Sequence, residues 1–565
     1  MIKNICLILL AADSSIFGRM GIKLPPLSIG IISSYLRQHG FTVDPFDLNK
    51  RMSECYSDKD IDGLEQLFEK DKIFDYVNGN NGNFFDTYAE AMFRDVDIDK
   101  YDLIAYSIGP NLSWLQTHSA LILGQFVKKR YRKIQVFGGM NIGNIVSFSP
   151  VYDELLELYL KNFPYVINGP GEGVLVKLID ALNRGKDLNH IKKINGVVFI
   201  TGDGKICSNP EEKKRIVCPD FDGLELDYYY NYLNKDNLDE TINALYCQPF
   251  LFTPKLQFPP RKNIGRYEQR LVLPYVFNFG CPYHCAFCAE SAASSSTPVI
   301  GKVDEVIDHL QTLTEKYNTP YFIFINNAVN YSKKYIIDLC DGILARKLNI
   351  YWSDCARFNN IDADILKKMK LAGCKKLVFG LEIASPGMID RINKQIDLDF
   401  TRQVLRWCSE IGIWAELEII VGIPTETEED FEYSVDYLEK NMKYIDYLTI
   451  NKYRPMPGSL MFQYSGRYGI ELVQGHTYEE NLQKDREILK KKQNTGTYAH
   501  LIKAFQFRET NGRSLQQVQD DTEKRYSHMM KFNNNLLLQK VKYYMRKGYL
   551  SMKDISFLSR EGMVP

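Results

Sequence analysis

Along most of the chain, short apolar runs alternate with longer stretches in which apolar residues recur every three to four positions. The runs have the length of buried strands, and the longer stretches have the period of amphipathic helices. In the first 215 residues the pattern predicts strands at 5–10, 41–47, 102–108, 134–137 and 165–167, and helices at 31–38, 114–130 and 174–182. This alternation, with glycines after several strands, predicts an open parallel sheet with a ligand cleft at the carboxyl ends of its strands.

The alternation continues at a regular spacing through residues 269–465. After a first apolar run at 271–279, it predicts strands at 321–325, 350–357, 376–382, 413–422 and 447–453, separated by helices at 303–317, 333–348, 363–372, 400–411 and 430–441. Six strand–helix units predict an open, partial (β/α)6 barrel. Its active side is expected where the carboxyl ends of the strands and their loops gather.

The remaining segments are less regular. Residues 51–100 are acidic, aromatic and poorly periodic, which predicts an insertion of loose helices, and residues 195–204 predict a small hairpin. In the last hundred residues the pattern predicts helices at 478–492, 498–507, 514–531 and 534–546. We therefore expect an α/β protein of four regions: a Rossmann-like domain at 1–215, a linker at 216–268, the partial barrel at 269–465 and a helical C-terminal region at 466–565.

Composition and charge narrow the expected partners and compartment. Apolar residues make up 45% of the chain and charged residues 25%, as in ordinary soluble proteins. Seventy basic and seventy acidic residues cancel, so no overall field attracts nucleic acid or an anionic membrane. Twelve cysteines suit a reducing cytoplasm, and no apolar run is long enough to span a membrane. The apolar start of the chain predicts a first strand rather than a signal peptide.

Three cysteines, Cys281, Cys285 and Cys288, follow the first barrel run in a C-x3-C-x2-C spacing. Three thiolates on one short loop can hold three irons of a [4Fe-4S] cluster and leave the fourth iron open to a small molecule. Zinc is an alternative, although it usually takes four ligands from paired C-x2-C motifs. His284 could supply a fourth ligand. Three unligated cysteines are the remaining possibility.

This spacing, with Phe287 just before the last cysteine, resembles the radical S-adenosylmethionine (SAM) superfamily. The resemblance implies that the methionine moiety of SAM chelates the open iron. An electron from the cluster then cleaves SAM to a 5′-deoxyadenosyl radical. An external electron donor such as flavodoxin or ferredoxin is implied as well.

The resemblance extends to the strand ends of the predicted barrel. The segment 379–385 resembles the family's fourth-strand contact with SAM, and 420–426 resembles the fifth-strand segment that packs against adenine. It implies SAM contacts from Phe287, Arg357, Glu382, Ser385, Gly422 and Glu426. Arg357 could pair with the SAM carboxylate, with Arg391 and Lys394 as alternatives. Thr425 and Glu426 could instead cap the next helix. Asn326 and Asn327 stand where relatives often carry acidic residues.

The N-terminal region resembles the cobalamin-binding domain fused to many radical SAM enzymes. Pro26, Ser107, Trp114, Gly138, Gly139, Gly171 and Glu172 are the implied cobalamin contacts. Small residues at these strand ends would let a planar corrin lie on the sheet edge. The D-x-H-x-x-G stretch that supplies a cobalt-ligating histidine is missing, and His39 and His118 are predicted to be surface or cap residues. Trp114 could cover the lower face of cobalamin or anchor its helix in the core, and the domain could keep the fold without cobalamin.

The resemblance implies a radical SAM enzyme, and cobalamin-dependent methylation of an unactivated carbon in a natural product or peptide is the leading hypothesis. The first alternative is a peptide epimerase with a cobalamin-free N-terminal domain, in which Cys355 returns a hydrogen atom to the substrate radical. Cys355 lies two residues before Arg357, hence on the same strand face, but free cysteine is also a common core residue, and that interpretation is favoured. An iron–sulfur binding or electron-transfer protein is the second alternative.

Overall fold

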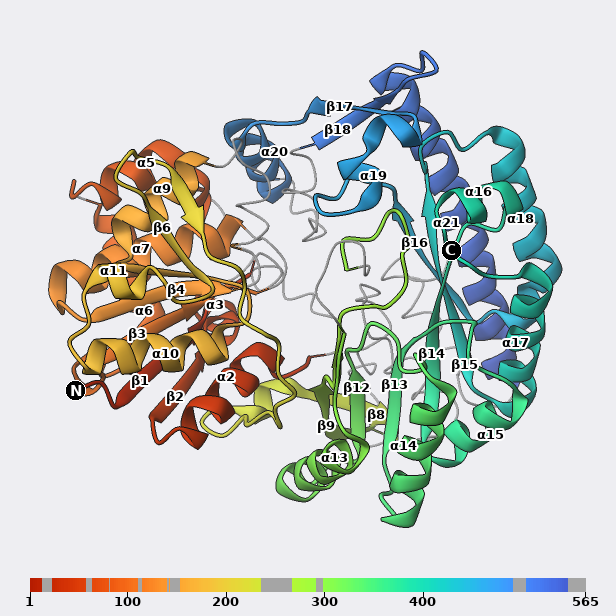
Figure 1. Ribbon diagram of the computed structural model, residues 1–565, viewed down its shortest axis with the longest axis horizontal. Coiled ribbons are helices and arrows are strands. Elements are labelled where there is room, and N and C mark those ends of the chain that lie inside the picture. The colour runs from red at the N-terminus through yellow and green to blue at the C-terminus, as the bar shows by residue number, and fades with distance from the viewer. Residues whose placement is uncertain are drawn as a thin grey trace. The chain divides into compact units, whose positions relative to one another are not determined.

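The protein is described from a computed structural model, shown in Figure 1. The structure describes residues 1–565 except 13–22, 57–63, 81, 110–113, 140–141, 143–152, 235–266, 291–297, 491–504 and 547–565. The chain divides into an N-terminal unit (1–20, 25–228 and 474–505) and a barrel unit (21–24, 229–473 and 506–565). The proline-rich part of the predicted linker lies outside the described residues. No helix of the described ranges is long and apolar enough to cross a membrane.

The N-terminal unit contains a seven-stranded sheet in the order β2-β1-β3-β4-β5-β6-β7. The strands are β1 Asn4–Leu9, β2 Thr42–Asp47, β3 Leu103–Ser107, β4 Ile134–Gly139, β5 Tyr165–Asn168, β6 Val197–Ile200 and β7 Ile206–Ser208. The first five run parallel, and β6 and β7 form the predicted hairpin at one edge. In this order β2 lies on one side of β1 and β3 on the other, so the order of the strands switches direction at β1. Open α/β sheets have their ligand crevice at such a switch point, outside the carboxyl ends of the strands.

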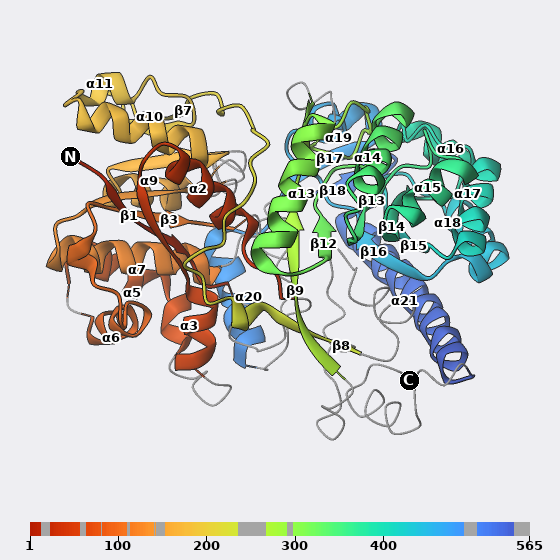
Figure 2. The same ribbon diagram turned by 90° about the horizontal axis from the view of Figure 1, so that it is seen from below.

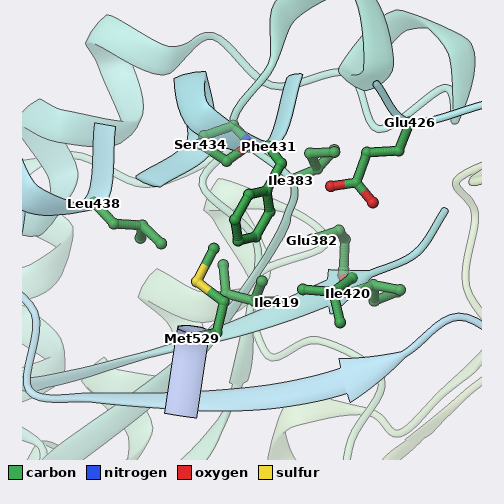
Figure 3. A pocket seen from close by; sticks show the side chains of 11 residues that line it. Glu382, Ile383, Ile419, Ile420, Glu426, Phe431, Ser434, Leu438 and Met529 are labelled. Carbon is green, nitrogen blue, oxygen red and sulfur yellow. The ribbon is translucent and has the colours of Figure 1, made fainter. Parts of the chain in front are cut away.

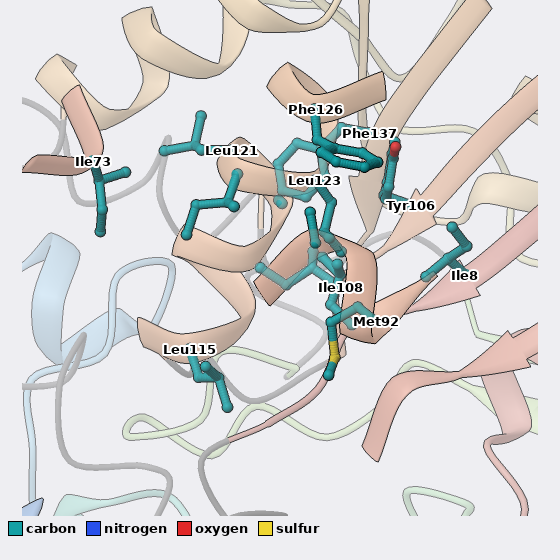
Figure 4. Close-up of a cluster of buried hydrophobic side chains, with 14 of the residues drawn as sticks. Ile8, Ile73, Met92, Tyr106, Ile108, Leu115, Leu121, Leu123, Phe126 and Phe137 are labelled. Carbon is teal, nitrogen blue, oxygen red and sulfur yellow. The ribbon is translucent and has the colours of Figure 1, made fainter. Parts of the chain in front are cut away.

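Helices cover both faces of this sheet, and each face has its own apolar core. The helical segments are α2 Leu27–Gln38, α3 Leu48–Cys55, η1 Glu65–Phe68, α5 Lys70–Val77, α6 Asn83–Met92, η2 Ile98–Lys100, α7 Trp114–Arg130, α9 Asp153–Asn162, α10 Gly171–Asn183 and α11 Leu188–Ile191. One core joins α2 and α10 to the sheet. The other joins α7 and α9 to the opposite face, and it includes Tyr106 and Phe137 of the strands and Phe126 of α7 (Figure 4).

The segment 51–100, predicted as loose helices, is an integral part of that second core. Ile73, Tyr88 and Met92 are fully buried in it. Because η1, α5 and α6 contact α7 on the side away from the sheet, α7 is buried on all sides from Trp114 to Val127. A helix buried all round lacks an amphipathic pattern, so the sequence could not indicate which segment covers it.

The barrel unit is built on a curled, seven-stranded sheet in the order β16-β15-β14-β13-β12-β9-β8. Its strands are β8 Tyr230–Asn234, β9 Tyr267–Tyr275, β12 Tyr321–Phe324, β13 Tyr351–Ala356, β14 Cys374–Glu382, β15 Trp414–Val421 and β16 Tyr447–Lys452. The six strands from β9 to β16 are parallel, and β8 is antiparallel at the edge. The predicted partial (β/α)6 barrel is therefore confirmed.

Helices cover the outer, convex face of this sheet, as Figures 1 and 2 show. They are α13 Val303–Tyr317, α14 Lys333–Ala345, α15 Ala363–Leu371, α16 Pro386–Arg391, α17 Leu398–Ile411 and α18 Glu428–Asn441. Shorter segments are β10 Asn278–Phe279, which pairs with β11 Val299–Ile300, and η6 Met442–Tyr444, α19 Leu460–Gln463 and η7 Ser465–Tyr468.

The C-terminal region is less helical than predicted. Residues 505–507 belong to β18 Phe505–Glu509, which pairs with β17 Ile470–Gln474, so the predicted helix is wrong there; its residues 498–504 lie outside the described residues. The two predicted helices after 514 form one helix, α21 Leu515–Arg546. Asn533, at the predicted break, instead hydrogen-bonds the backbone N–H and C=O of Leu448 at 3.0 Å each. Asn533 thereby pairs backbone groups of β16 that have no strand partner at this edge of the sheet.

Helix α20, Tyr478–Lys490, belongs to the N-terminal unit although it follows the barrel strands in sequence. The Tyr478 ring lies 4.8 Å from that of Trp114, and its hydroxyl donates to Nε2 of His118 at 2.5 Å. Nδ1 of His118 donates to the carbonyl of Leu67 at 2.5 Å. His118 is fully buried, so the prediction of a surface or cap residue is wrong. Burial lowers its pKa to about 4, which keeps the imidazole neutral.

Candidate functional site

The loop that carries the three cysteines begins at the carboxyl end of β9 and is fixed from the neighbouring strand. Oδ1 of Asn326, just after β12, accepts the backbone N–H groups of Phe277 and Asn278, both at 2.9 Å. The Tyr331 hydroxyl donates to the carbonyl of Gly280 at 2.7 Å, and Gly280 has a left-handed φ of 74°. The loop therefore starts on the predicted active side of the barrel with a defined direction.

The three thiols lie close together on this loop. Burial raises the pKa of Cys281 and raises that of Cys288 to about 12, and each is raised further by neighbouring cysteine thiols. Cys285 is buried, and the backbone N–H of Cys288 donates to its carbonyl at 3.2 Å. Iron binding would drive these thiols to thiolates. Three adjacent thiols fit a cluster in which each sulfur takes a different iron.

A site for a single metal ion is not formed in the described part of the chain. No three His, Cys, Asp or Glu side chains of these residues converge as ligands of one ion. His284, which the zinc alternative requires, is exposed. Its backbone carbonyl accepts a hydrogen bond from Nδ2 of Asn393 at 2.9 Å.

Arg357 follows β13 and packs directly against the cysteine loop. Its guanidinium lies 3.6 Å from the centre of the Tyr283 ring and donates to Sγ of Cys285 at 3.5 Å. A second nitrogen donates to the carbonyl of Lys394 at 2.7 Å. The structure thus places a positive charge next to a sulfur that is anionic when it ligates iron. The pairing of Arg357 with a SAM carboxylate stays a prediction.

Glu382 ends β14 in a left-handed conformation, with a φ of 65°. The pairing of β14 with β15 shifts register between Gly380 and Glu382. The Lys394 ammonium donates to Oε1 of Glu382 at 2.7 Å, and both side chains are over nine-tenths buried. Lys394 is therefore engaged by Glu382, and its ammonium lies 5.7 Å from the centre of the Phe287 ring. A non-glycine residue held in such a conformation is typical of ligand sites.

Ser385, predicted to contact SAM, begins α16 and is buried. Its hydroxyl donates to the carboxylate of Asp430 on α18, and the backbone N–H of Ala384 donates to the Ser434 hydroxyl at 3.2 Å. These contacts tie the segment after β14 to α18. A SAM contact from Ser385 stays a prediction, and the serine already has a structural partner.

The loop after β15 is held by α21. A Cβ added to Gly422, whose φ is 74°, would overlap the Thr522 side chain. The sequence predicted that adenine packs closely against Gly422, but in the structure the group that packs against this glycine is Thr522. Glu426 accepts the N–H of Gly422 at 2.7 Å and pairs with Arg525 at 3.0 Å. Burial raises the pKa of Glu426 to about 7. The helix cap is Thr427, in a capping box with Asp430, so capping by Thr425 or Glu426 is wrong.

A pocket lies beside this loop, between the ends of β14 and β15 and helices α18 and α21. In Figure 3 Glu382 and Glu426 lie on one side of a lining that is mostly apolar. The other lining residues are Ile383, Ala384, Ile419, Ile420, Val421, Phe431, Ser434, Leu438 and Met529. The pocket brings together the two glutamates that the sequence assigned to SAM.

The glycine pair at the end of β4 is required by the sheet itself. A Cβ on Gly138 would overlap the carbonyl of Ile167, and one on Gly139, with a φ of 145°, would overlap that of Ile108. Their small size is therefore explained without a corrin. Contact of either glycine with cobalamin stays a prediction.

The other predicted cobalamin residues lie near the carboxyl edge of the same sheet. Ser107 ends β3, Pro26 precedes α2, and Gly171 begins α10. Glu172 is nearly fully buried, and burial raises its pKa while Arg215 opposes the shift. Trp114 is fully buried beneath Tyr478, which supports its role as a core residue. Residues 110–113 of the loop before it lie outside the described residues.

Comparison with known proteins identifies the central region. Residues 275–438, which contain the cysteine loop, match the family model of the Radical SAM superfamily. The barrel unit contains a radical SAM domain. The chain is 24% identical to an uncharacterized methyltransferase of Pyrococcus horikoshii, over 82% of this chain and 83% of that protein. It is also 24% identical to an anaerobic magnesium-protoporphyrin IX monomethyl ester cyclase of Rubrivivax gelatinosus, over 67% of this chain but only 62% of the cyclase.

Solved structures show the same fold at low sequence identity. The radical SAM methyltransferase TsrM from Kitasatospora setae, solved with cobalamin and a [4Fe-4S] cluster, has a TM-score of 0.55 and 15% identity over 84% of this chain and 77% of TsrM. The cobalamin-dependent SAM radical enzyme OxsB, solved with aqua-cobalamin, has a TM-score of 0.54 and 16% identity over 100% of this chain and 76% of OxsB. The predicted fold class and the prediction of a radical SAM enzyme are confirmed.

Proposed function

We propose that this protein is a cobalamin-dependent radical SAM enzyme that methylates an unactivated carbon of a small molecule or peptide. The match of residues 275–438 to the Radical SAM superfamily supports the proposal most directly, because this range includes all three cysteines. The cofactors named for TsrM and OxsB, and the methyltransferase name of the Pyrococcus relative, favour methyl transfer over other radical chemistry.

The barrel unit would hold the cluster and SAM. Cys281, Cys285 and Cys288 would each bind one iron, and the bound cluster would supply the electron that cleaves SAM to a 5′-deoxyadenosyl radical. Arg357 would hold Cys285 in place and offset its negative charge. Glu382, oriented by Lys394, would bind a donor group of SAM from the end of β14.

The N-terminal unit would hold cobalamin, which would carry the methyl group. The support is the β2-β1-β3 order, which puts a ligand crevice at the ends of β1 and β3. Ser107, the last residue of β3, is in register there with Gly138, one residue before the end of β4. Glu172, buried at the start of α10, would present its carboxyl at the same edge.

Anaerobic reconstitution tests the proposal. The purified chain, supplied with iron, sulfide and reductant, is expected to bind roughly four irons and to form 5′-deoxyadenosine from SAM. Cys288→Ala should lose both, whereas Cys408→Ala, a matched buried cysteine in α17, should keep both. SAM cleavage by Cys288→Ala at the wild-type rate would refute the cluster assignment. Absence of cobalamin absorbance at full iron loading would refute cobalamin-dependent methylation.

Epimerisation with Cys355 as the hydrogen donor is the second candidate. Burial raises the pKa of Cys355 far above its ordinary value, with Glu418 adding to the shift. The sulfur therefore keeps its hydrogen at neutral pH, as a hydrogen-atom donor requires. Product that gains one solvent deuterium without a methyl group, and that disappears with Cys355→Ala, would select this candidate.

A further inference from the structure

Arg357 is a buried cation without a carboxylate partner. Its residue is 9% exposed, and its guanidinium makes no ion pair with an Asp or Glu among the residues that the structure describes. Lys394, a second buried cation beside the cysteine loop, differs because Glu382 neutralises it. Burying a charge without a counter-charge is costly. An anion from outside the chain is therefore expected beside Arg357.

One nitrogen of Arg357 also lacks a hydrogen-bond partner. Nη1 donates to Sγ of Cys285, and Nη2 donates to the carbonyl of Lys394. Nε is buried and has no partner in the described part of the chain, whereas buried N–H groups almost always have one. An orphaned N–H on a guanidinium that already contacts a cysteine sulfur fits an anionic acceptor nearby. A cluster held by Cys285 would supply one through its thiolate and sulfide atoms.

Neighbouring residues fix the position of Arg357. Oδ1 of Asn330 accepts the backbone N–H of Arg357 at 2.9 Å, and Nδ2 of Asn330 donates to the carbonyl of Arg357 at 2.7 Å. The Tyr283 ring lies 3.6 Å from the guanidinium, and the Tyr283 hydroxyl accepts from Nδ2 of Asn360 at 3.3 Å. Because backbone and guanidinium are both held in a buried site, the positive charge acts on Cys285 with little screening by water.

We propose that Arg357 raises the reduction potential of the cluster bound by Cys281, Cys285 and Cys288, by holding its positive charge against the Cys285 sulfur. Reduction adds one electron from an external donor, and with it one negative charge, to the cluster. A fixed cation stabilises the more negative, reduced form more than the oxidised form. The inference rests on the proposed function, because it assumes that the three thiols bind a [4Fe-4S] cluster.

The competing assignment for Arg357 is the carboxylate of SAM, which is also an anion. Two of the three guanidinium nitrogens already donate to atoms of the chain. A bidentate pair with a carboxylate needs two nitrogens, so it would have to share one of these donors. The structure therefore favours the cluster as the partner of Arg357, and a measurement without SAM separates the two assignments.

Potentiometric titration of the SAM-free protein tests this inference. The full chain, reconstituted anaerobically, is reduced stepwise with titanium(III) citrate, and the reduced cluster is followed by EPR. Arg357→Gln should shift the reduction equilibrium at least tenfold toward the oxidised cluster, which lowers the potential by about 59 mV or more. Arg357→Lys, which keeps the charge, should retain most of the wild-type potential. The control Arg406→Met removes an exposed cation of α17 that is paired with Glu410 and should leave the potential unchanged.

Equal potentials of Arg357→Gln and the wild type would overturn the inference, and weaker SAM binding by that variant would then assign Arg357 to the SAM carboxylate. Equal shifts in Arg357→Gln and Arg357→Lys would overturn it as well, because the charge would not matter.

If Arg357→Gln does not load iron, Arg357→Met takes its place. Failure of both neutral variants to load would mean that the charge holds the cluster and does not set its potential, so the inference would fail. Each of these results on a loaded wild-type chain leaves the proposed function standing, whereas a wild-type chain that binds no iron would refute the proposed function itself.

Discussion

The buried ion pair between Glu426 and Arg525 makes a quantitative prediction. The two side chains are 2% and 4% exposed and 3.0 Å apart. In Arg525→Met, Glu426 loses its counter-charge and keeps only neutral backbone N–H donors, those of Gly422 and Ile423. Leaving a buried charge unpaired costs about 3–5 kcal/mol. Glu426 can avoid part of this cost by binding a proton, because its pKa is already raised to about 7.

The cost of the substitution should therefore depend on pH. Below pH 7 Glu426 is protonated in both folded proteins, and Arg525→Met loses only hydrogen bonds, about 1–2 kcal/mol. Above pH 7 the wild-type carboxylate is charged and paired, whereas the variant keeps its proton and its pKa is higher still. The unfolded glutamate is charged throughout this range, so the variant loses about 1.4 kcal/mol of further stability per pH unit. The total difference in stability between variant and wild type levels off at about 3–5 kcal/mol, the cost of leaving a buried charge unpaired.

Urea unfolding at pH 6, 7, 8 and 9, followed by tryptophan fluorescence, measures this difference. Three of the four tryptophans lie in the barrel unit. The control Lys524→Met, next to Arg525 on α21, removes an exposed pair with Glu428 of α18 and should cost about 0–1 kcal/mol at every pH. Adding Glu426→Gln to Arg525→Met should remove the pH dependence. A deficit that is constant from pH 6 to 9 would refute the reasoning.

Three further substitutions test neighbouring contacts. Gly422→Ala forces an alanine into a left-handed backbone against Thr522 and should cost about 1–3 kcal/mol in thermal unfolding; full recovery by Thr522→Ala would show that strain plays no part. Lys394→Met leaves Glu382 unpaired and should weaken SAM binding at least tenfold in equilibrium dialysis, and unchanged affinity would contradict a binding role. His118→Phe leaves two buried polar partners unsatisfied and should destabilise the N-terminal unit by about 1–3 kcal/mol, with faster proteolysis in α20 as the readout.

Much of the fold could be predicted because both sheets consist of buried parallel strands. Such strands give nearly uninterrupted apolar runs, and their crossover helices are amphipathic, so α13 was predicted with the bounds observed. The errors fall where a partner distant in sequence decides the structure. Phe507 joins a strand because β17 pairs with it, and Asn533 continues a helix because β16 exposes a backbone edge beside it.

The candidate site was only partly predictable for the same reason. Spacing alone identified the cysteine loop, since its three thiols lie within eight residues. The partners of Glu426 and Gly422 could not be found, because Arg525 and Thr522 lie about a hundred residues away on α21.

The amide of Asn326, just after β12, connects the cysteine loop to β13. Nδ2 of Asn326 donates to Oδ2 of Asp354 at 2.6 Å. Both are buried, and burial raises the pKa of Asp354 to about 8. The amide can therefore accept two N–H groups from the start of the cysteine loop while its own N–H group donates to the neighbouring strand. An acid at 326 would face Asp354 as a second carboxyl, so the asparagine is what lets the carboxyl lie on β13 and still fix the loop.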